Sequence, residues 1–151
     1  MGVVGGGLMA AEVRPAAISS GAAPVRPGLD QAALDEALDD IRAALAAAEA
    51  AGVPAERYIA AHRAALRVAA WVLASRRPRL RERRSVWAVV AQVAPELAEW
   101  ADHFALHQTR RQVVEAGAVA LISAREADDL LRDAGAFRDA ARLTRGPDGR
   151  G

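Results

Sequence analysis

The sequence predicts an all-α protein, an up-and-down bundle of four to five helices. Alanine supplies 39 of the 151 residues, about half of the hydrophobic set, and it has the highest helix propensity of any residue. Apolar residues recur at intervals of three and four in several long stretches, and no stretch alternates as a strand would. Short connections between such helices favour antiparallel neighbours, which gives the up-and-down arrangement.

The helical domain is predicted to cover residues 29–143. Residues 1–28 are rich in Gly, Ala and Pro and show no periodicity, so they are interpreted as a disordered leader. Residues 144–151 are interpreted as a disordered tail.

The first helix is expected from about Asp30, a suitable N-cap, to Ala51, with Gly52 as its stop. Four apolar residues form one stripe along it: Leu34, Leu38, Ile41 and Leu45. Four acidic residues lie beside that stripe and are interpreted as a solvated face: Asp35, Glu36, Asp39 and Asp40.

The second helix is expected to begin at Pro54, because proline suits the first helical position, and to end before Pro78. Its apolar stripe consists of Ile59, His62, Leu66, Ala69 and Leu73. A histidine therefore lies on the face that points into the core. Residues 76–84, RRPRLRERR, follow as a basic connection.

The third stretch begins after Ser85, an N-cap candidate, and Pro95 predicts a break near Ala94 before the helix restarts. Leu97, Trp100, Ala101 and Phe104 share one face of the continuation, which is expected to fade around Glu115–Gly117. A capping box, in which Ser123 is followed three residues later by Glu126, predicts the start of the last helix.

Composition excludes several classes of protein. There is no Cys, which rules out a disulfide scaffold, thiol catalysis and Cys-based zinc sites. No apolar run reaches the length of a membrane span, and the N-terminus lacks the charged region of a secretory signal, so a cytoplasmic protein without membrane contact is expected. The net charge of +1 argues against a globally basic nucleic-acid binder. All 20 basic residues are Arg, which reflects either a high-GC genome or the suitability of guanidinium for phosphate.

Arg57 and His62 form the first candidate site. A histidine can move a proton near neutral pH, and an arginine can stabilise charge that develops on a phosphate. The pair would therefore suit metal-independent RNA cleavage. A five-residue step turns a helix by roughly 140°, so the two side chains do not share a face. The alternative is a core histidine and a surface arginine.

Glu99, His103 and His107 form the second candidate site, because they fall on one face of the helix after Pro95. Two histidines four residues apart can share a metal ion. No fourth ligand is evident, so the alternative is an ordinary polar face. No metal and no other cofactor is expected.

The basic connection is the third candidate site. Its six arginines could follow a phosphate backbone, and Trp87 is near enough to suggest stacking on a base. The alternative is a solvated turn whose arginines pair with the acidic first helix. The arginines assigned to nucleic-acid binding are Arg76, Arg77, Arg79, Arg81, Arg83 and Arg84.

Three segments together resemble a known family: ERYIAAHRAALRVAAWVLASRRPR, SVWAVVAQVAPELAEWADHFA and SAREADDLLRDAGAF. They are similar to the actinobacterial SAV-type branch of the HEPN superfamily (higher eukaryote and prokaryote nucleotide-binding domains). The resemblance runs from about Asp30 to Arg142. It implies a helical bundle that is often dimeric, and an RNA-processing, phage-defence or toxin–antitoxin setting.

The family signature is an Arg followed after four to six residues by a His, and only Arg57 and His62 match it here. The resemblance implies that catalytic members carry this motif on a later helix of the domain. In this sequence the motif lies at the start of the second predicted helix. Branches that have lost the motif serve only in binding.

Two functions are therefore predicted. The first is an RNA-directed domain that acts as a metal-independent endoribonuclease through Arg57 and His62 as catalytic residues. The second is a non-catalytic helical module that binds RNA or protein. A homodimer is expected in either case, with an antitoxin as a possible protein partner.

Overall fold

The computed structural model describes residues 12–13, 27–79 and 83–145, and these residues form five α-helices and two short 3-10 turns. The helices are α3 (Pro27–Ala50), α4 (Pro54–Arg76), α5 (Val86–Val93), α6 (Ala98–Glu115) and α7 (Ala124–Arg145). The turns are η1 (Pro95–Leu97) and η2 (Val119–Leu121). The predicted all-α bundle is confirmed.

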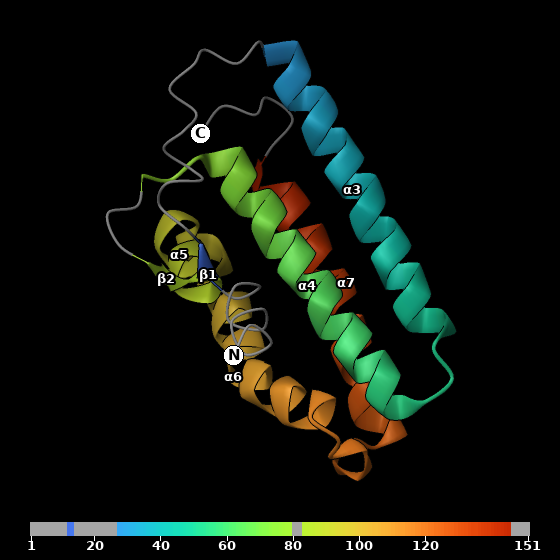
Figure 1. Ribbon diagram of the computed structural model, residues 1–151. Coiled ribbons are helices and arrows are strands. Elements are labelled where there is room, and N and C mark those ends of the chain that lie inside the picture. Colours follow the sequence, from blue (N-terminus) through green and yellow to red (C-terminus); the bar gives the residue numbers. More distant parts are fainter. Residues whose placement is uncertain (1–11, 14–26, 80–82, 146–151) are drawn as a thin grey trace.

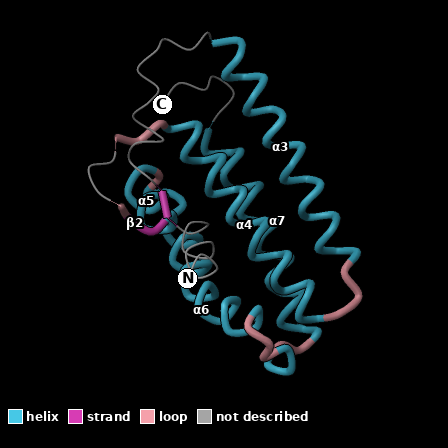
Figure 2. Tube along the Cα trace, viewed as in Figure 1, coloured by secondary structure: helices cyan, strands magenta, loops and turns pink. Residues whose placement is uncertain are grey.

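The helices alternate in direction along the chain. Figure 1 shows α3 descending, α4 rising, α5 and α6 descending together, and α7 rising again. Consequently α4 and α7 run in the same direction, with α4 at the centre of the bundle between α3, α6 and α7 (Figure 2).

Most of the predicted helix boundaries agree with the structure. Helix α4 spans Pro54–Arg76, and the third stretch breaks at Ala94, whose backbone leaves the helical region before η1 begins. Helix α6 ends at Glu115, and Gly117 follows with a positive φ of 122°.

The start of α3 differs from the prediction. The helix begins at Pro27 rather than after Asp30, because proline, with its fixed φ, opens the first turn. Asp30 is therefore inside the helix and is not its N-cap.

A two-stranded ladder joins the N-terminal region to the basic connection. Strand β1 (Glu12–Val13) pairs antiparallel with β2 (Arg84–Ser85), with Glu12 opposite Ser85. Two residues per strand are too few to show an alternating pattern in the sequence, so this ladder has no sequence signal. The rest of the predicted leader up to residue 26, and the tail from residue 146, lie outside the described residues, so the domain limits stay a prediction.

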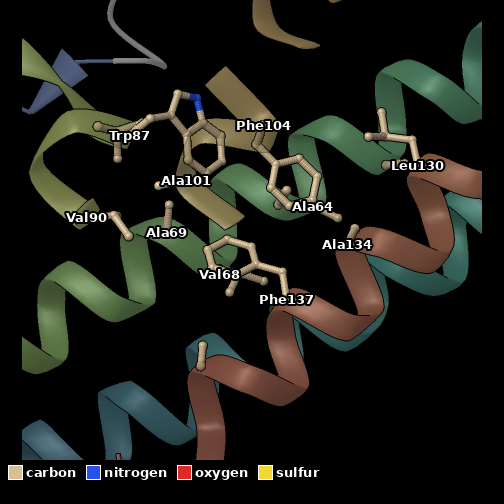
Figure 3. Close-up of a cluster of buried hydrophobic side chains, with 14 of the residues drawn as sticks. Ala64, Val68, Ala69, Trp87, Val90, Ala101, Phe104, Leu130, Ala134 and Phe137 are labelled. Carbon is tan, nitrogen blue, oxygen red and sulfur yellow. The ribbon is translucent and has the colours of Figure 1, made fainter. Parts of the chain in front are cut away.

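The core combines small residues with a few large rings. Helix α4 contributes a completely buried set that consists of Ala61, Ala64, Ala65, Val68 and Ala69. Over it lie Trp87, Phe104 and Phe137 from three other helices, with neighbouring ring centroids 5.4–6.2 Å apart (Figure 3). The alanines on α4 let the neighbouring helices approach closely, and the rings fill the space that remains.

Two serines cap helices as predicted. The Ser85 hydroxyl accepts a hydrogen bond from the Trp87 N–H at 3.2 Å, and the Ser123 hydroxyl accepts one from the Glu126 N–H at 3.1 Å. The Glu126 carboxylate accepts a bond from Arg110 at 2.7 Å. Within the described ranges, none of the helices combines the length and apolarity that a membrane span requires.

Candidate functional site

His62 is completely buried in the core of the bundle. Its Nε2 lies 2.9 Å from the Phe104 carbonyl oxygen, which accepts a hydrogen bond from the ring N–H, and its Nδ1 has no partner. Trp87 and Phe104 contact the imidazole edge-on, with centroids 5.8 and 6.1 Å away. Burial lowers the pKa of His62 to about 4, so the imidazole is neutral at physiological pH.

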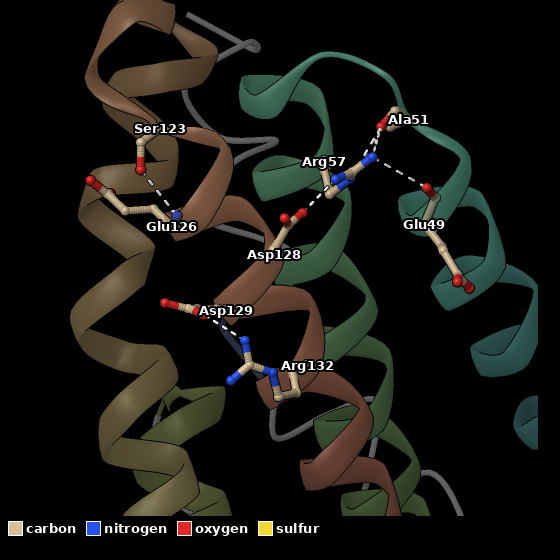
Figure 4. Close-up of polar contacts among 8 residues, drawn as sticks. All are labelled: Glu49, Ala51, Arg57, Ser123, Glu126, Asp128, Asp129 and Arg132. Carbon is tan, nitrogen blue, oxygen red and sulfur yellow. Dashed lines mark hydrogen bonds and ion pairs between the residues drawn. The ribbon is translucent and has the colours of Figure 1, made fainter.

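Arg57 holds the turn between α3 and α4 against the start of α7 (Figure 4). Its Nε and one terminal nitrogen donate to the Ala51 carbonyl at 3.1 and 2.7 Å, and the same terminal nitrogen reaches the Glu49 carbonyl at 3.4 Å. The other terminal nitrogen pairs with the Asp128 carboxylate. All three guanidinium nitrogens therefore have partners within the chain.

The structure does not bring Arg57 and His62 together as a reactive pair. The imidazole points into the aromatic core, whereas the guanidinium lies at the end of the bundle on Asp128. A guanidinium from a second subunit could not reach His62 either, because none of its surface is accessible. The catalytic assignment stays a prediction, and this geometry supports the alternative of a core histidine and a structural arginine.

The basic connection places most of its described arginines on the surface. Arg77, Arg79, Arg83 and Arg84 are exposed, and Arg84 donates to the Gln92 side chain. Arg76 is half-buried, where it pairs with Glu96 and donates to the Val93 carbonyl at 3.3 Å. Arg81 lies outside the described residues. These cations surround the junction between α4 and α5.

Trp87 takes no part in this surface. It is buried, and its indole N–H donates to the Gln108 side chain at 2.8 Å. The expectation that Trp87 could stack on a base was wrong. Ser85 is the N-cap of α5, so Trp87 lies in the first turn of that helix, where its ring stacks on Phe104 in the core.

The histidines of α6 form a chain of contacts between α4 and α7. The Tyr58 hydroxyl lies 2.7 Å from His107 Nδ1, and His103 Nε2 lies 2.9 Å from an Asp133 carboxylate oxygen. The two imidazole centroids are 4.8 Å apart. Burial and the neighbouring His103 lower the pKa of His107, and burial raises the pKa of Tyr58 to about 12.

These contacts do not make a metal centre. Glu99 is exposed, and among the described residues no three His, Asp or Glu side chains are placed to hold a metal ion. Both imidazoles use a ring nitrogen on a protein partner instead.

Sequence reasoning missed the partners of the predicted residues. Asp128 lies 71 positions from Arg57, and Asp133 and Tyr58 come from helices other than α6, so no local spacing indicates the contacts. Arg111 was missed as well: it is buried, it pairs with Glu115 at 3.0 Å, and its Nε and one terminal nitrogen have no partner.

Comparison with known proteins assigns the family. The profile of the SAV-like HEPN domain matches residues 46–142, more than half of the chain and nearly all of the helical bundle from the end of α3 onwards. No curated protein and no solved structure shows significant similarity to the chain. The matched region contains Arg57, His62, the basic connection and the histidines of α6. The chain belongs to the SAV-like HEPN family.

Proposed function

We propose that this HEPN domain binds RNA through its basic connection and does not cleave it with Arg57 and His62. The observation that carries the non-catalytic part is the complete burial of His62 on the Phe104 carbonyl. A general acid or base must come within hydrogen-bond reach of the proton that it moves, and a substrate has no access to this imidazole.

The binding part rests on the exposed arginines of the basic connection. Arg79, Arg83 and Arg84 lie on the surface within six residues of the chain, in the connection between α4 and α5. Clustered guanidinium groups neutralise phosphates and release counterions, which supplies affinity without sequence preference. Because Trp87 is buried, base stacking by this residue contributes nothing. The proposal therefore predicts binding that depends strongly on salt and weakly on sequence.

A salt titration of RNA affinity tests the binding. The triple variant Arg79→Gln, Arg83→Gln and Arg84→Gln is compared with wild type for binding to labelled single-stranded RNA by fluorescence anisotropy. Loss of three phosphate contacts should reduce the steepness of the plot of log association constant against log salt concentration by about 2. A control variant with the same net charge carries Arg42→Gln, Arg67→Gln and Arg125→Gln, which are exposed on other surfaces. Equal loss in both variants would refute the proposed interface.

Cleavage is tested in the same samples. Wild type, Arg57→Lys and His62→Gln are incubated with mixed RNAs in EDTA, and the fold of each is checked by circular dichroism. We expect intact RNA in all three. Metal-independent cleavage by wild type that disappears in a folded His62→Gln variant would restore the endoribonuclease prediction.

A further inference from the structure

An open cavity of about 520 Å³ lies between the end of α3, the start of α4 and the middle of α7. Leu45 and Leu131 supply apolar lining, and guanidinium groups come from Arg57, Arg132 and Arg138. The volume falls in the range of sites for small organic ligands, and five of the eight lining residues are charged. Neither the basic connection nor His62 lines this cavity.

The three arginines differ in how firmly they are held. The Arg57 guanidinium is held by two backbone carbonyls and Asp128, so it is a fixed part of the cavity lining (Figure 4). Arg132 pairs with Asp129 at 2.6 Å and Arg138 with Asp139 at 3.0 Å, each within α7. Ion pairs of this exposed kind contribute little, so an anion in the cavity can compete for both guanidinium groups.

The balance of charge in the lining is positive. Two acidic residues, Glu49 and Asp128, line the cavity with three arginines, and Asp128 and Arg57 neutralise each other. Planar guanidinium groups bind phosphate and carboxylate through paired hydrogen bonds. Arg132 and Arg138 are paired with Asp129 and Asp139, but each guanidinium has N–H donors beyond those contacts, and these donors lie beside the leucines.

Gly135 provides an independent observation. It lies inside α7, where glycine destabilises a helix relative to alanine, and it lines the cavity. A Cβ added at this position would meet no atom within 4 Å, so packing of the chain does not require glycine there. Glycine leaves the helix backbone bare at the point between the two arginines, where a ligand can approach it closely.

We propose that this cavity binds a small organic anion with an apolar body and one phosphate or carboxylate group. The body lies on Leu45 and Leu131 against the backbone of Gly135, and the anionic group lies between Arg132 and Arg138. The cavity is near the start of α4, roughly 30 Å of helix from the basic connection, so its occupation is independent of the proposed RNA interface.

Calorimetric titration of the full chain tests the site and separates the two anion types. The probes are phenyl phosphate, benzoate and inorganic phosphate. We expect one site per chain for phenyl phosphate or benzoate, and weaker binding of inorganic phosphate, which lacks the apolar body. Absence of saturable binding by both aromatic probes would overturn the proposal, whatever the result of the RNA titration.

Variants of α7 locate the site. Arg132→Gln and Arg138→Gln should each weaken binding of the preferred probe by about tenfold, the effect of one charge-assisted hydrogen bond. Arg125→Gln is the matched control, because Arg125 is exposed on the same helix outside the cavity, and it should bind as wild type does. Equal weakening in all three variants would mean general charge attraction and would overturn the site.

Gly135→Ala should change stability and binding in opposite directions. Alanine favours the helix and meets no atom, so the melting temperature should rise. The new methyl group projects toward the ligand, so the affinity for the aromatic probe should fall. Wild-type affinity in this variant would overturn the proposed approach of the ligand to the helix backbone.

Discussion

Besides the phenol of Tyr58, His62 and Arg111 are the buried side chains with titratable or charged groups in the described part of the chain. His62 has one ring nitrogen bonded to a backbone carbonyl and the other without a partner. Arg111 shares the Glu115 carboxylate with Arg63, which lies 2.8 Å from the same oxygen. The interior of the bundle therefore holds polar groups that are only partly satisfied, and the buried imidazole of His62 makes the fold sensitive to pH.

Acidification should destabilise the protein through His62. Its pKa is about 4 in the folded chain against 6.5 in the unfolded chain, so the unfolded state binds more protons between these values. The stabilisation is complete above pH 6.5 and is lost as the pH falls toward 4. Between pH 7 and pH 5 the free energy of unfolding should drop by about 2 kcal/mol. Urea denaturation at the two pH values measures this.

His62→Phe is the control for that pH dependence. Phenylalanine keeps an aromatic ring in the pocket and cannot be protonated, so most of the difference between pH 7 and pH 5 should disappear. His107, whose pKa is also lowered, accounts for a remainder of the same sign. An unchanged pH dependence in a folded His62→Phe variant would show that His62 is not the responsible group.

The sequence could predict the burial of His62 but not its chemistry. The intervals of three and four place residue 62 on the apolar stripe of α4, and the residue is buried as that stripe requires. Its partner, the Phe104 carbonyl, lies 42 positions away on α6, and no local pattern links the two. The spacing of Arg57 and His62 matched a family signature, although their partners lie in different parts of the bundle.

At the level of elements, helix ends follow local side-chain chemistry. Ser85 and Ser123 each satisfy a backbone N–H in the first turn of their helix, and Pro95 restarts the chain after Ala94. These signals depend on neighbours within four residues, which explains why the sequence predicts them. The β1–β2 ladder depends on residues more than 70 positions apart, and it was missed.

Removing the cap of α7 should weaken the whole fold. Ser123→Ala leaves the Glu126 N–H without its partner, and loss of an N-cap typically costs about 1 kcal/mol. Ser75→Ala is the control, because the Ser75 hydroxyl donates to the Trp71 carbonyl within α4 and caps no helix. Chemical denaturation should show a lower free energy of unfolding for Ser123→Ala and a smaller change in that free energy for Ser75→Ala. Equal changes would contradict the capping role.

The whole molecule depends on alanines at its centre. Ala61, Ala64, Ala65 and Ala69 of α4 are all completely buried, and Ala134 of α7 is buried in the same core (Figure 3). Aromatic residues make up only 4% of the sequence, and this shortage of bulky side chains is met by close contact between helices around a few aromatic rings. Composition could predict that packing would be close, but it could not predict which helix would be central.

Enlarging a central alanine should force the helices apart. Ala69→Leu adds three carbons where no space is available, and overpacking of this kind costs about 1–3 kcal/mol. Ala70→Leu is the matched control, because the adjacent residue is exposed on the same helix. Thermal unfolding should show a clear drop for position 69 and little change for position 70. Equal melting temperatures for Ala69→Leu and Ala70→Leu would mean that the interior can expand to hold the larger side chain.

The predicted homodimer can be tested at the face of α6 and η2. Leu106, Val113, Val119 and Leu121 leave bulky apolar side chains exposed along this part of the chain. If two copies meet there, Leu106→Glu should shift the mass measured by light scattering toward a monomer. Leu143→Glu is the control, because Leu143 is equally exposed near the end of α7. A wild-type monomer at high concentration would contradict the homodimer prediction.

The contact of Arg57 with Asp128 has a consequence for the order in which the chain assembles during synthesis. It joins the start of α4 to the start of α7, across 71 residues. Helix α4 leaves the ribosome early, yet α7, which packs along it and supplies Phe137 to its core, is made after the other four described helices. A nascent chain that stops before Ala124 therefore exposes the alanine face of α4, and the synthesis of α7 becomes the event that closes the bundle.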